Sequence, residues 1–313
     1  MTSMDTPWNV VSSSPSFGRY SDEPLGVLEA GECTVQLLER GDQESLAKSL
    51  RTAHAWVAGF EPVDESTLAH ADAIRVVAKC GAGLDNFDLD YLKAKGIAVV
   101  SVPGGNSMAV AEYAMTQMLA LARGTVTNDA AVRTGAWKPN VGMGLGGRTL
   151  GIVGYGAIGQ GVARLAIAFG MRVIVADPFV DVATARTEGI EILGLEALLG
   201  DADFVSLHVP LSEDTRHMFG EAEFARMKPQ AFLVNDSRGG IVDESALRAA
   251  LASGVIAGAA VDVFETEPLP TDSPLLGVPN LIVSPHTAGY SDTALSAVTL
   301  SCANSVLAAL RAS

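Results

Sequence analysis

The side chains that could do chemistry in this sequence follow predicted strands in the second half of the chain. Arg238 follows one strand, the acidic segment 264–268 follows the next, and His286 follows a third. In a doubly wound parallel sheet, ligands bind beyond the carboxyl ends of the strands. We therefore expect a guanidinium, a carboxylate and an imidazole to meet at one rim of a sheet.

These three groups suit the interconversion of a 2-oxo acid and a 2-hydroxy acid. A fork-shaped guanidinium can hold a carboxylate together with the neighbouring carbonyl oxygen. An imidazole exchanges protons near neutral pH, and a carboxylate bonded to its second nitrogen favours the protonated ring. The reaction also requires a hydride donor, so these groups should be accompanied by a redox cofactor site.

Residues 149–159 predict such a site. An apolar run leads into a Gly-x-Gly-x-x-Gly pattern formed by Gly154, Gly156 and Gly159. The first glycine permits a tight turn, the second lets a pyrophosphate approach the backbone, and the third allows the helix to pack closely on the strand. The N-terminus of the helix that follows favours phosphate groups.

An acid completes the dinucleotide pattern. A helical run over 160–170 and an apolar strand over 171–176 lead to Asp177, which lies near the expected spacing of about 20 residues after the last glycine. Asp177 would accept hydrogen bonds from the ribose hydroxyls of the adenosine half, and its charge would repel a 2′-phosphate. We therefore predict NAD rather than NADP. The alternative is a glycine-rich turn in some other α/β protein.

Composition limits the classes of function. The chain has 313 residues, a length from which we expect about two domains. Its formal net charge is −15 and it has no basic block, so we expect no nucleic-acid partner. The three cysteines show no CxxC spacing, and the histidines show no HxxxH or HExxH pattern. We therefore expect neither a disulfide framework nor a metal site. Neither a signal peptide nor a membrane-spanning run is recognisable, so we expect a cytoplasmic protein without a membrane partner.

Strands and helices alternate along both halves, which predicts the α/β class with two doubly wound parallel-sheet domains. Residues 1–20 are expected to be loose apart from 8–11. In the first half, strands are predicted over 33–38, 55–59, 74–80 and 97–102, and helices over 43–50, 64–70 and 89–95. In the second half, strands are predicted over 204–208, 231–235, 256–263 and 281–284, and a helix over 244–252.

Two further helices define the predicted domains. The helix 107–123 is expected to bridge them, and the helix 291–310 is expected to return to the first domain. The domain assignment is therefore 1–104 with 290–313 for one domain and 105–289 for the other. Trp137 stands alone in a polar link, either as part of a subunit interface or as a local packing anchor.

Several segments together resemble the D-isomer-specific 2-hydroxyacid dehydrogenase family. In the second domain they are Gly154–Gly159, Asn235–Gly239, Asp262–Pro268 and Ser284–Gly289. In the first domain, Cys80–Asn86 followed by Gly96-Ile97 and Pro103–Ser107 resembles the substrate-domain signature of the family. The resemblance extends over about residues 70–310, and the first 70 residues match the family only in the alternation of predicted strands and helices.

The resemblance implies a Rossmann NAD-binding domain and a flavodoxin-like discontinuous substrate domain, usually in a homodimer with the 107–123 helix and the Trp137 arm in the interface. It implies that Arg238 orients the substrate and that His286 is the general acid/base. The family's histidine partner directly precedes the proline, which implies Glu267 rather than Glu265.

The resemblance also implies the binding residues. The substrate would contact Cys80, Gly81, Ala82, Gly83, Arg238 and His286, the first four through backbone N–H groups. The cofactor would be lined by Gly154, Gly156, Ala157, Ile158, Gly159, Asp177, Val209, Pro210, Ser237, Asp262 and Gly289. His208 is expected to order the loop 209–215 rather than to take part in the chemistry.

The substrate prediction rests on the segment 79–88, which resembles the phosphoglycerate dehydrogenase branch most. We therefore expect oxidation of 3-phosphoglycerate, without a C-terminal regulatory domain, and we keep reduction of glyoxylate or hydroxypyruvate as the alternative. Lys79 is either solvated or a contact to a phosphorylated substrate. A different class is an NAD(H)-sensing binding protein, because the family includes transcriptional corepressors.

Overall fold

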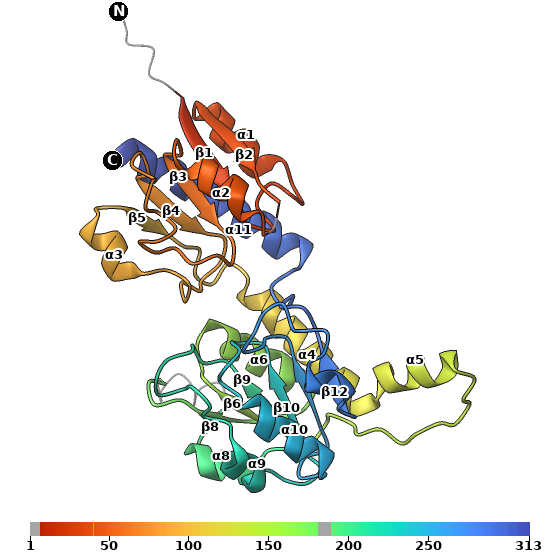
Figure 1. The fold of residues 1–313 in the computed structure, drawn as a ribbon. Helices are drawn as coiled ribbons and strands as arrows, with labels where there is room; N and C mark the ends of the chain where they lie inside the picture. The colour runs from red at the N-terminus through yellow and green to blue at the C-terminus, as the bar shows by residue number, and fades with distance from the viewer. Residues whose placement is uncertain (1–6, 40, 181–188) are drawn as a thin grey trace, which may run out of the picture. The chain divides into compact units, whose positions relative to one another are not determined.

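The chain folds into two compact α/β units. The computed structural model describes residues 7–39, 41–180 and 189–313. One unit extends to Asn106 and includes Tyr290–Ser313, and the other is Ser107–Gly289. Each unit is a parallel sheet with helices on both faces (Figure 1), which confirms the predicted fold class.

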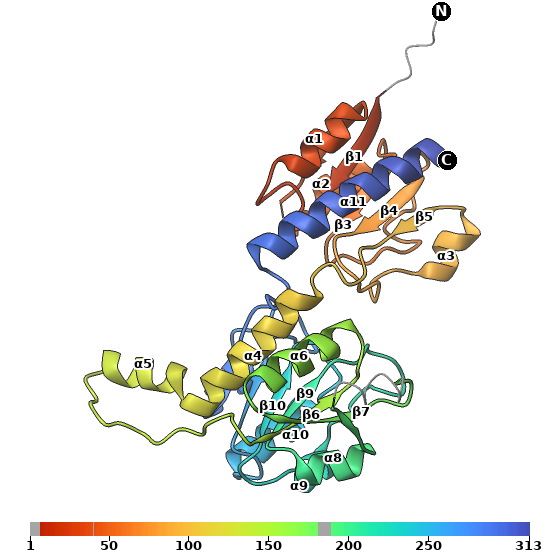
Figure 2. The ribbon, with the colours of Figure 1, turned by 180° about the vertical axis from the view of Figure 1, so that it is seen from behind.

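The first unit contains a five-stranded sheet in the order β2-β1-β3-β4-β5, the flavodoxin-like order of a doubly wound sheet. Its strands are β1 (Trp8–Ser12), β2 (Cys33–Leu37), β3 (Ala55–Ala58), β4 (Val76–Lys79) and β5 (Ala98–Val100). Its helices are α1 (Glu23–Ala30), α2 (Gln43–Leu50), α3 (Leu89–Ala94) and α11 (Asp292–Ala312). Figure 2 shows α1 and α11 side by side on one face of this sheet.

Apolar residues on both faces of the strands build two cores in this unit. Val10 packs with α1 and α11, whereas its neighbour Val11 packs with α2 and α3, and both are fully buried. Such continuous apolar runs are typical of strands in parallel sheets. Helix α11 is long and apolar enough to cross a membrane, but Cys302 and Val306 lie in the core beneath it.

One prediction for the first unit was wrong, and one of its helices was not predicted. Residues 64–70 form turns instead of a helix: Asp64 accepts hydrogen bonds from the Ser66 hydroxyl and the Thr67 N–H, but one capped turn is too short to offset helix nucleation. Helix α1 was missed because Pro24 and Gly26 weaken its helical signal. Residues 1–6 lie outside the described residues.

The second unit contains a seven-stranded sheet in the order β12-β11-β10-β9-β6-β7-β8. Its strands are β6 (Thr149–Val153), β7 (Arg172–Ala176), β8 (Glu191–Ile192), β9 (Phe204–Leu207), β10 (Phe232–Asn235), β11 (Gly258–Val261) and β12 (Leu281–Val283). Its helices include α4 (Ser107–Arg123), α5 (Thr125–Arg133), α6 (Ala157–Ala168), α8 (Leu195–Asp201), α9 (Glu221–Arg226) and α10 (Glu244–Ala252), with the short 3₁₀ helix η1 (Pro274–Gly277).

Adjacent residues of β6 again point into different cores. Ile152 packs with α4 and α6, and Val153 packs with α8, α9 and α10. The strand order reverses at β6, because β7 lies on one side of it and β9 on the other. The loops that follow β6 and β9 therefore meet at the topological switch point, where ligands bind in such sheets.

Helix α5 and the segment after it project from the second unit, as Figures 1 and 2 both show. The helix has no buried residue. Large apolar side chains along this arm are nevertheless exposed, among them Val126, Val132, Trp137 and Val141. The arm therefore presents apolar surface that nothing in its own unit covers.

Candidate active site

The glycine-rich loop follows β6 at the switch point and has two glycines that packing requires. Gly154 has φ +94°, and a Cβ there would lie 2.4 Å from the carbonyl oxygen of His208. A Cβ on Gly159 would lie 2.2 Å from the carbonyl oxygen of Gly154. Both positions exclude any side chain, so the loop approaches the end of β9 and its own helix closely.

Gly156 differs from these two glycines. It is exposed and is the N-cap of α6, and a Cβ built on it would meet no atom within 4 Å. Its lack of a side chain is therefore not needed for packing within the chain. It keeps open the space before the first N–H groups of α6, next to Ala157 and Ile158, where a helix N-terminus attracts phosphate. The loop thus fits the pyrophosphate of a dinucleotide.

Asp177 stands at the end of β7 beside this loop. Its carboxylate accepts hydrogen bonds from the N–H of Tyr155, at 2.6 Å, and from the N–H of Phe179, at 2.7 Å. A carboxylate has about four acceptor positions, so these two bonds leave capacity for ribose hydroxyls. The acid thus ties the glycine loop to the neighbouring strand and can still accept further hydrogen bonds.

The remaining predicted cofactor residues follow β9, β10, β11 and β12. Val209 and Pro210 come directly after His208, and Gly289 ends the His286 loop. Ser237 donates its hydroxyl to the carbonyl of Leu207 at 2.5 Å. Asp262 is fully buried and organises the last loop, because its carboxylate accepts the hydroxyl of Ser284 and two backbone N–H groups.

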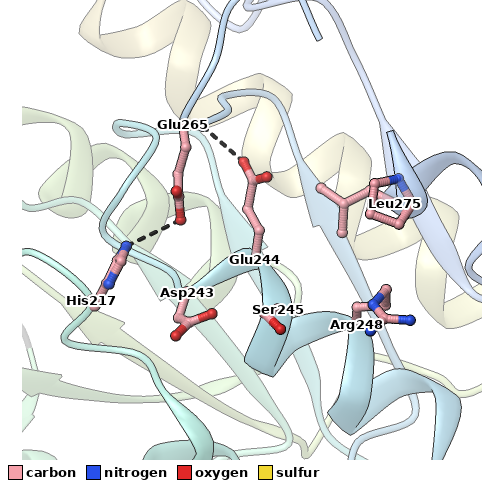
Figure 3. Close-up of a pocket in the computed structure, with 8 residues that line it drawn as sticks. His217, Asp243, Glu244, Ser245, Arg248, Glu265 and Leu275 are labelled. Carbon is pink, nitrogen blue, oxygen red and sulfur yellow. Dashed lines mark hydrogen bonds and ion pairs between the residues drawn. The ribbon is translucent and has the colours of Figure 1, made fainter. Parts of the chain in front are cut away.

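The loops after β11 and β12 bring Glu267 and His286 together. Oε2 of Glu267 lies 2.8 Å from Nδ1 of His286, and its Oε1 accepts the N–H of Phe264 at 3.1 Å. Glu265 instead pairs with Nε2 of His217 at 3.1 Å, as Figure 3 shows. The structure therefore places Glu267, and not Glu265, against the His286 ring.

The pKa of Glu267 is lower than usual. Burial raises the pKa of this carboxyl, but the hydrogen bond and charge of His286 outweigh burial and lower the pKa, with help from the Phe264 N–H and the charge of Arg238. Glu267 is therefore a carboxylate near neutral pH, able to hold a protonated imidazole.

Arg238 reaches the same region because the loop after β10 packs closely on the loop after β11. A Cβ on Gly239 would lie 1.8 Å from the carbonyl oxygen of Phe264, so only glycine fits there. The half-buried guanidinium donates through Nη1 to the carbonyl of Ser237 at 2.7 Å. Arg238, Glu267 and His286 thus lie in one region of the second unit.

His286 has a backbone conformation that L-residues rarely adopt. Its φ is +53°, which for a non-glycine residue typically costs about 1–3 kcal/mol and occurs most often at functional sites. The carbonyl of Asp262 accepts the His286 N–H at 2.8 Å, and its carboxylate accepts the N–H groups of Thr287 and Ala288. Buried Asp262 therefore holds the strained residue in place.

His208 differs from its prediction. Its Nε2 pairs with the hydroxyl of Ser206 at 2.9 Å, and burial lowers the pKa of the ring to about 4. The loop 209–215 is organised by Thr215, whose hydroxyl donates to the carbonyl of Pro210 and accepts the N–H of Ser212. His208 is therefore a neutral, packed residue near physiological pH.

The predicted substrate loop lies in the first unit, after β4. Cys80 and Gly83 are half-buried, Ala82 is exposed, and Gly81 has φ +149°. The Lys79 ammonium donates to the carbonyl of Gly59 and to Oδ1 of Asn86, and it lies 5.0 Å from the centre of the Phe60 ring. Lys79 is therefore engaged within its own unit.

A separate cavity of about 360 Å³ lies beside the His217–Glu265 pair (Figure 3). It is lined by His217, Asp243, Glu244, Ser245, Arg248, Glu265, Pro274 and Leu275. None of the three predicted catalytic residues lines it, and no sequence motif indicated it. Within residues 7–39, 41–180 and 189–313, no group of three or more histidine, cysteine or acidic side chains could hold a metal ion.

Comparison with known proteins places this geometry among dehydrogenases. Residues 115–288 match the family model "D-isomer specific 2-hydroxyacid dehydrogenase, NAD binding domain". The chain is 45% identical to a glyoxylate reductase of Korarchaeum cryptofilum over 74% of this chain and 71% of the relative. It is 46% identical to an (S)-sulfolactate dehydrogenase of Chromohalobacter salexigens over 73% and 75%.

Other similar proteins include a D-3-phosphoglycerate dehydrogenase of Methanocaldococcus jannaschii, which is 40% identical over 85% of this chain but only 51% of the relative. Among solved structures, the TT0316 protein of Thermus thermophilus superposes with a TM-score of 0.89 at 32% identity, covering 97% of both chains. A D-lactate dehydrogenase of Aquifex aeolicus, solved with NAD and lactic acid, has a TM-score of 0.84 at 27% identity, covering 97% and 96%.

Proposed function

The chain belongs to the D-isomer specific 2-hydroxyacid dehydrogenase family, and from this premise we propose that it reduces glyoxylate or hydroxypyruvate with NADH. It is an NAD-dependent oxidoreductase of 2-hydroxy acids. The observation that supports the proposed catalytic set is the 2.8 Å contact between Glu267 and His286, next to the guanidinium of Arg238.

In the proposed reaction, bound NADH supplies the hydride. Arg238 holds the substrate carboxylate and the carbonyl oxygen through its paired N–H donors. The Glu267 carboxylate accepts a hydrogen bond from Nδ1–H of His286, which assigns proton exchange with the substrate oxygen to Nε2 of His286. The carboxylate stabilises the protonated ring, so His286 can protonate the oxygen as the carbonyl is reduced. We propose that backbone N–H groups over Cys80–Gly83 contact the substrate carboxylate as well.

This proposal assigns cofactor binding to the same residues that the sequence predicts. Gly156 admits the pyrophosphate, and the N-terminus of α6 with Ala157 and Ile158 binds it. Asp177 accepts the ribose hydroxyls of the adenosine half, and Asp262 holds the loop on which His286 lies. Val209, Pro210, Ser237 and Gly289 complete the lining.

Two observations favour the glyoxylate or hydroxypyruvate reading over the initial expectation of 3-phosphoglycerate. The chain is 45% identical to the glyoxylate reductase and 40% identical to the phosphoglycerate dehydrogenase. The Lys79 ammonium, which would have contacted a phosphate, is bonded to Gly59 and Asn86 instead.

The acidic residue Glu61 adds to this argument. The order of the first sheet reverses between β1 and β3, where ligands of doubly wound sheets bind. At this point Glu61 accepts the Ser13 hydroxyl at 3.0 Å and the Gly59 N–H at 3.1 Å. A carboxylate there repels a second anionic group on the substrate. The same repulsion opposes a sulfonated acid, which the similarity to the sulfolactate dehydrogenase makes the second candidate.

The substrate assignment is tested with purified protein, NADH and a panel of four acids: glyoxylate, hydroxypyruvate, 3-phosphohydroxypyruvate and 3-sulfopyruvate. We expect the highest kcat/KM with one of the first two. A higher kcat/KM with the phosphorylated or the sulfonated acid would reject the proposed substrate class. Tight NADH binding without turnover of any acid would instead favour the NAD(H)-sensing alternative.

We also propose that the protein is a cytoplasmic homodimer. The support for dimerisation is the arm formed by α5 and the segment after it, because Trp137 is 86% exposed there in the single chain. Burying such a side chain between two copies would stabilise an interface by about 1.5–3 kcal/mol. Molar mass in solution, measured by light scattering, tests this proposal.

A further inference from the structure

The loop after β11 is bound by a residue to which the proposed chemistry assigns no role. The N–H of Glu265 donates to Oε1 of Glu244 at 2.8 Å, and Figure 3 shows this bond beside the pair of Glu265 with His217. Glu244 is the first residue of α10 and is half-buried. It precedes Glu265 by 21 residues, so the bond joins two elements that are separate in the sequence.

Helix α10 does not need Glu244 as a cap. Asp243 is its N-cap, and the Asp243 carboxylate accepts the N–H of Ala246 at 2.9 Å. An acid in the first turn gains a general attraction to the positive end of the helix, which depends on its charge. The bond to Glu265 depends instead on the reach of the side chain, so substitutions can separate these two effects.

The electrostatics show that Glu244 lies among like charges. Burial raises the pKa of its carboxyl, the hydrogen bond from Glu265 lowers it, and the charges of Glu265 and Asp243 raise it, with the net result that the pKa is above its usual value. Two neighbouring acids therefore repel an ionised Glu244, while the loop N–H favours it. The hydrogen bond is the contact that offsets this repulsion.

The peptide group between Phe264 and Glu265 is held from two sides. Glu244 accepts its N–H, and its carbonyl oxygen lies so close to Gly239 that a Cβ there would come within 1.8 Å. The preceding N–H, that of Phe264, donates to Oε1 of Glu267 at 3.1 Å. The orientation of this peptide therefore helps to set where the Glu267 carboxylate lies.

We propose that Glu244 is a positioning residue for Glu267. By accepting the Glu265 N–H, Glu244 fixes the peptide 264–265 and with it the adjacent N–H of Phe264. That N–H holds one oxygen of Glu267, so the other oxygen stays 2.8 Å from Nδ1 of His286. This inference rests on the proposed function, because it takes the pair of Glu267 and His286 as the catalytic pair.

Three variants of Glu244 separate reach from charge. Glutamine keeps an acceptor at the same reach without the charge, aspartate keeps the charge but is one methylene shorter, and alanine has neither. A misplacement of about 1 Å can cost about 10²-fold in rate. Because the contact of the loop carbonyl with Gly239 remains, kcat should fall about 5- to 20-fold in E244A and E244D but less than about twofold in E244Q.

The pH profile of kcat/KM supplies a readout that a general loss of folded protein would not move. E244A and E244D should shift the profile toward acid, because a less firmly held Glu267 stabilises the protonated ring less. E244Q should keep the wild-type profile. The double variant E244A/E267Q should shift it no further than E267Q alone, since both changes act through one interaction.

The matched control is E221A. Glu221 is exposed and is the first residue of α9, as Glu244 is of α10, so E221A should keep the wild-type kcat and profile. A shifted profile or a large loss of kcat in E244Q would overturn the proposal, and so would a wild-type profile in E244D. Should E244A not fold, this comparison of E244Q with E244D decides.

Failure of the positioning role and failure of the proposed function give different results. A shift in E267Q without one in E244A and E244D would remove the positioning role and leave the proposed function in place. An unmoved profile in E267Q would refute the proposed role of Glu267, and the positioning role would be refuted with it.

Discussion

Oε2 of Glu267 lies 2.8 Å from Nδ1 of His286, whereas Glu265, two residues earlier in the same loop, pairs with His217 at 3.1 Å. The loop after β11 therefore supplies the glutamates of two histidine–glutamate pairs, and the two pairs have different surroundings. The Glu267 pair lies near the guanidinium of Arg238, whereas His217 and Glu265 line the separate cavity. This difference makes the two glutamates matched variants for testing the proposed chemistry.

Replacing Glu267 with glutamine should move the pH profile of 2-oxo acid reduction toward acid by about one unit, because the protonated ring loses its anionic partner. The profile of kcat/KM against pH measures this shift. Glu265→Gln is the control and should leave the profile in place. A shift in the Glu265 variant alone would mean that Glu265, and not Glu267, is the acidic partner of the catalytic histidine.

Replacing Arg238 with lysine should lower kcat/KM by about 10- to 100-fold, since an ammonium cannot reproduce two charge-assisted hydrogen bonds worth about 1.5–3 kcal/mol each. Steady-state kinetics with NADH and the preferred acid measure the loss. Arg248→Lys is the matched control, because Arg248 lines the separate cavity. Near-normal kinetics of the Arg238 variant would exclude this residue from the site.

Alanine at Gly156 should weaken NADH binding by about tenfold or more, equivalent to about 1.4 kcal/mol, and leave the fold intact. The reason is that its Cβ enters open space before α6. Alanine at Gly154 should instead destabilise the fold, because φ is +94° and the Cβ would contact His208. Fluorescence titration and thermal unfolding separate the two. Normal NADH affinity in the Gly156 variant would place the pyrophosphate elsewhere.

Replacing Asp177 with alanine should narrow the preference for NADH over NADPH, because the charge that repels a 2′-phosphate is removed. The variant should also lose some stability, since Tyr155 and Phe179 lose their acceptor. Asp177→Asn removes the charge while keeping an acceptor, so it should change cofactor preference with a smaller loss of stability. Unchanged cofactor preference in both variants would make Asp177 a structural residue only.

Serine in place of Trp137 and Val141 should convert a dimer into a monomer, with the folded monomer retained, because neither side chain has a burying contact in its own unit. Light scattering at several protein concentrations measures this change. Phe179→Ser is the control, as Phe179 is 93% exposed outside the arm. A wild type that is monomeric at all concentrations would refute dimerisation.

The local parts of the fold were predictable from local patterns. The helices 43–50, 107–123 and 244–252 have the predicted bounds, because amphipathic spacing and capping residues act over a few positions. Short helices such as α8 and α9 were missed, since they are only seven and six residues long. Their stability comes from packing on the sheet, which no local pattern reports.

The sequence predicts the site only for residues that directly follow predicted strands, because the carboxyl ends of parallel strands lie at the same rim of the sheet. Arg238 and His286 follow strands, so parallel pairing places them at one rim without further knowledge. The choice between Glu265 and Glu267 needed either a family resemblance or the coordinates, because both are carboxylates in one loop.

Helix α11 supplies Val298, Cys302, Ala303, Val306 and Leu310 to a core whose remaining buried members come from residues 10–102. The ribosome therefore synthesises the entire second unit before it synthesises the helix that completes the core of the first unit. Until then one face of the nascent five-stranded sheet has no cover over part of its apolar surface. Emergence of α11, rather than of the N-terminal half, sets the earliest moment at which that unit can close, and chaperones have the whole of that interval in which to bind it.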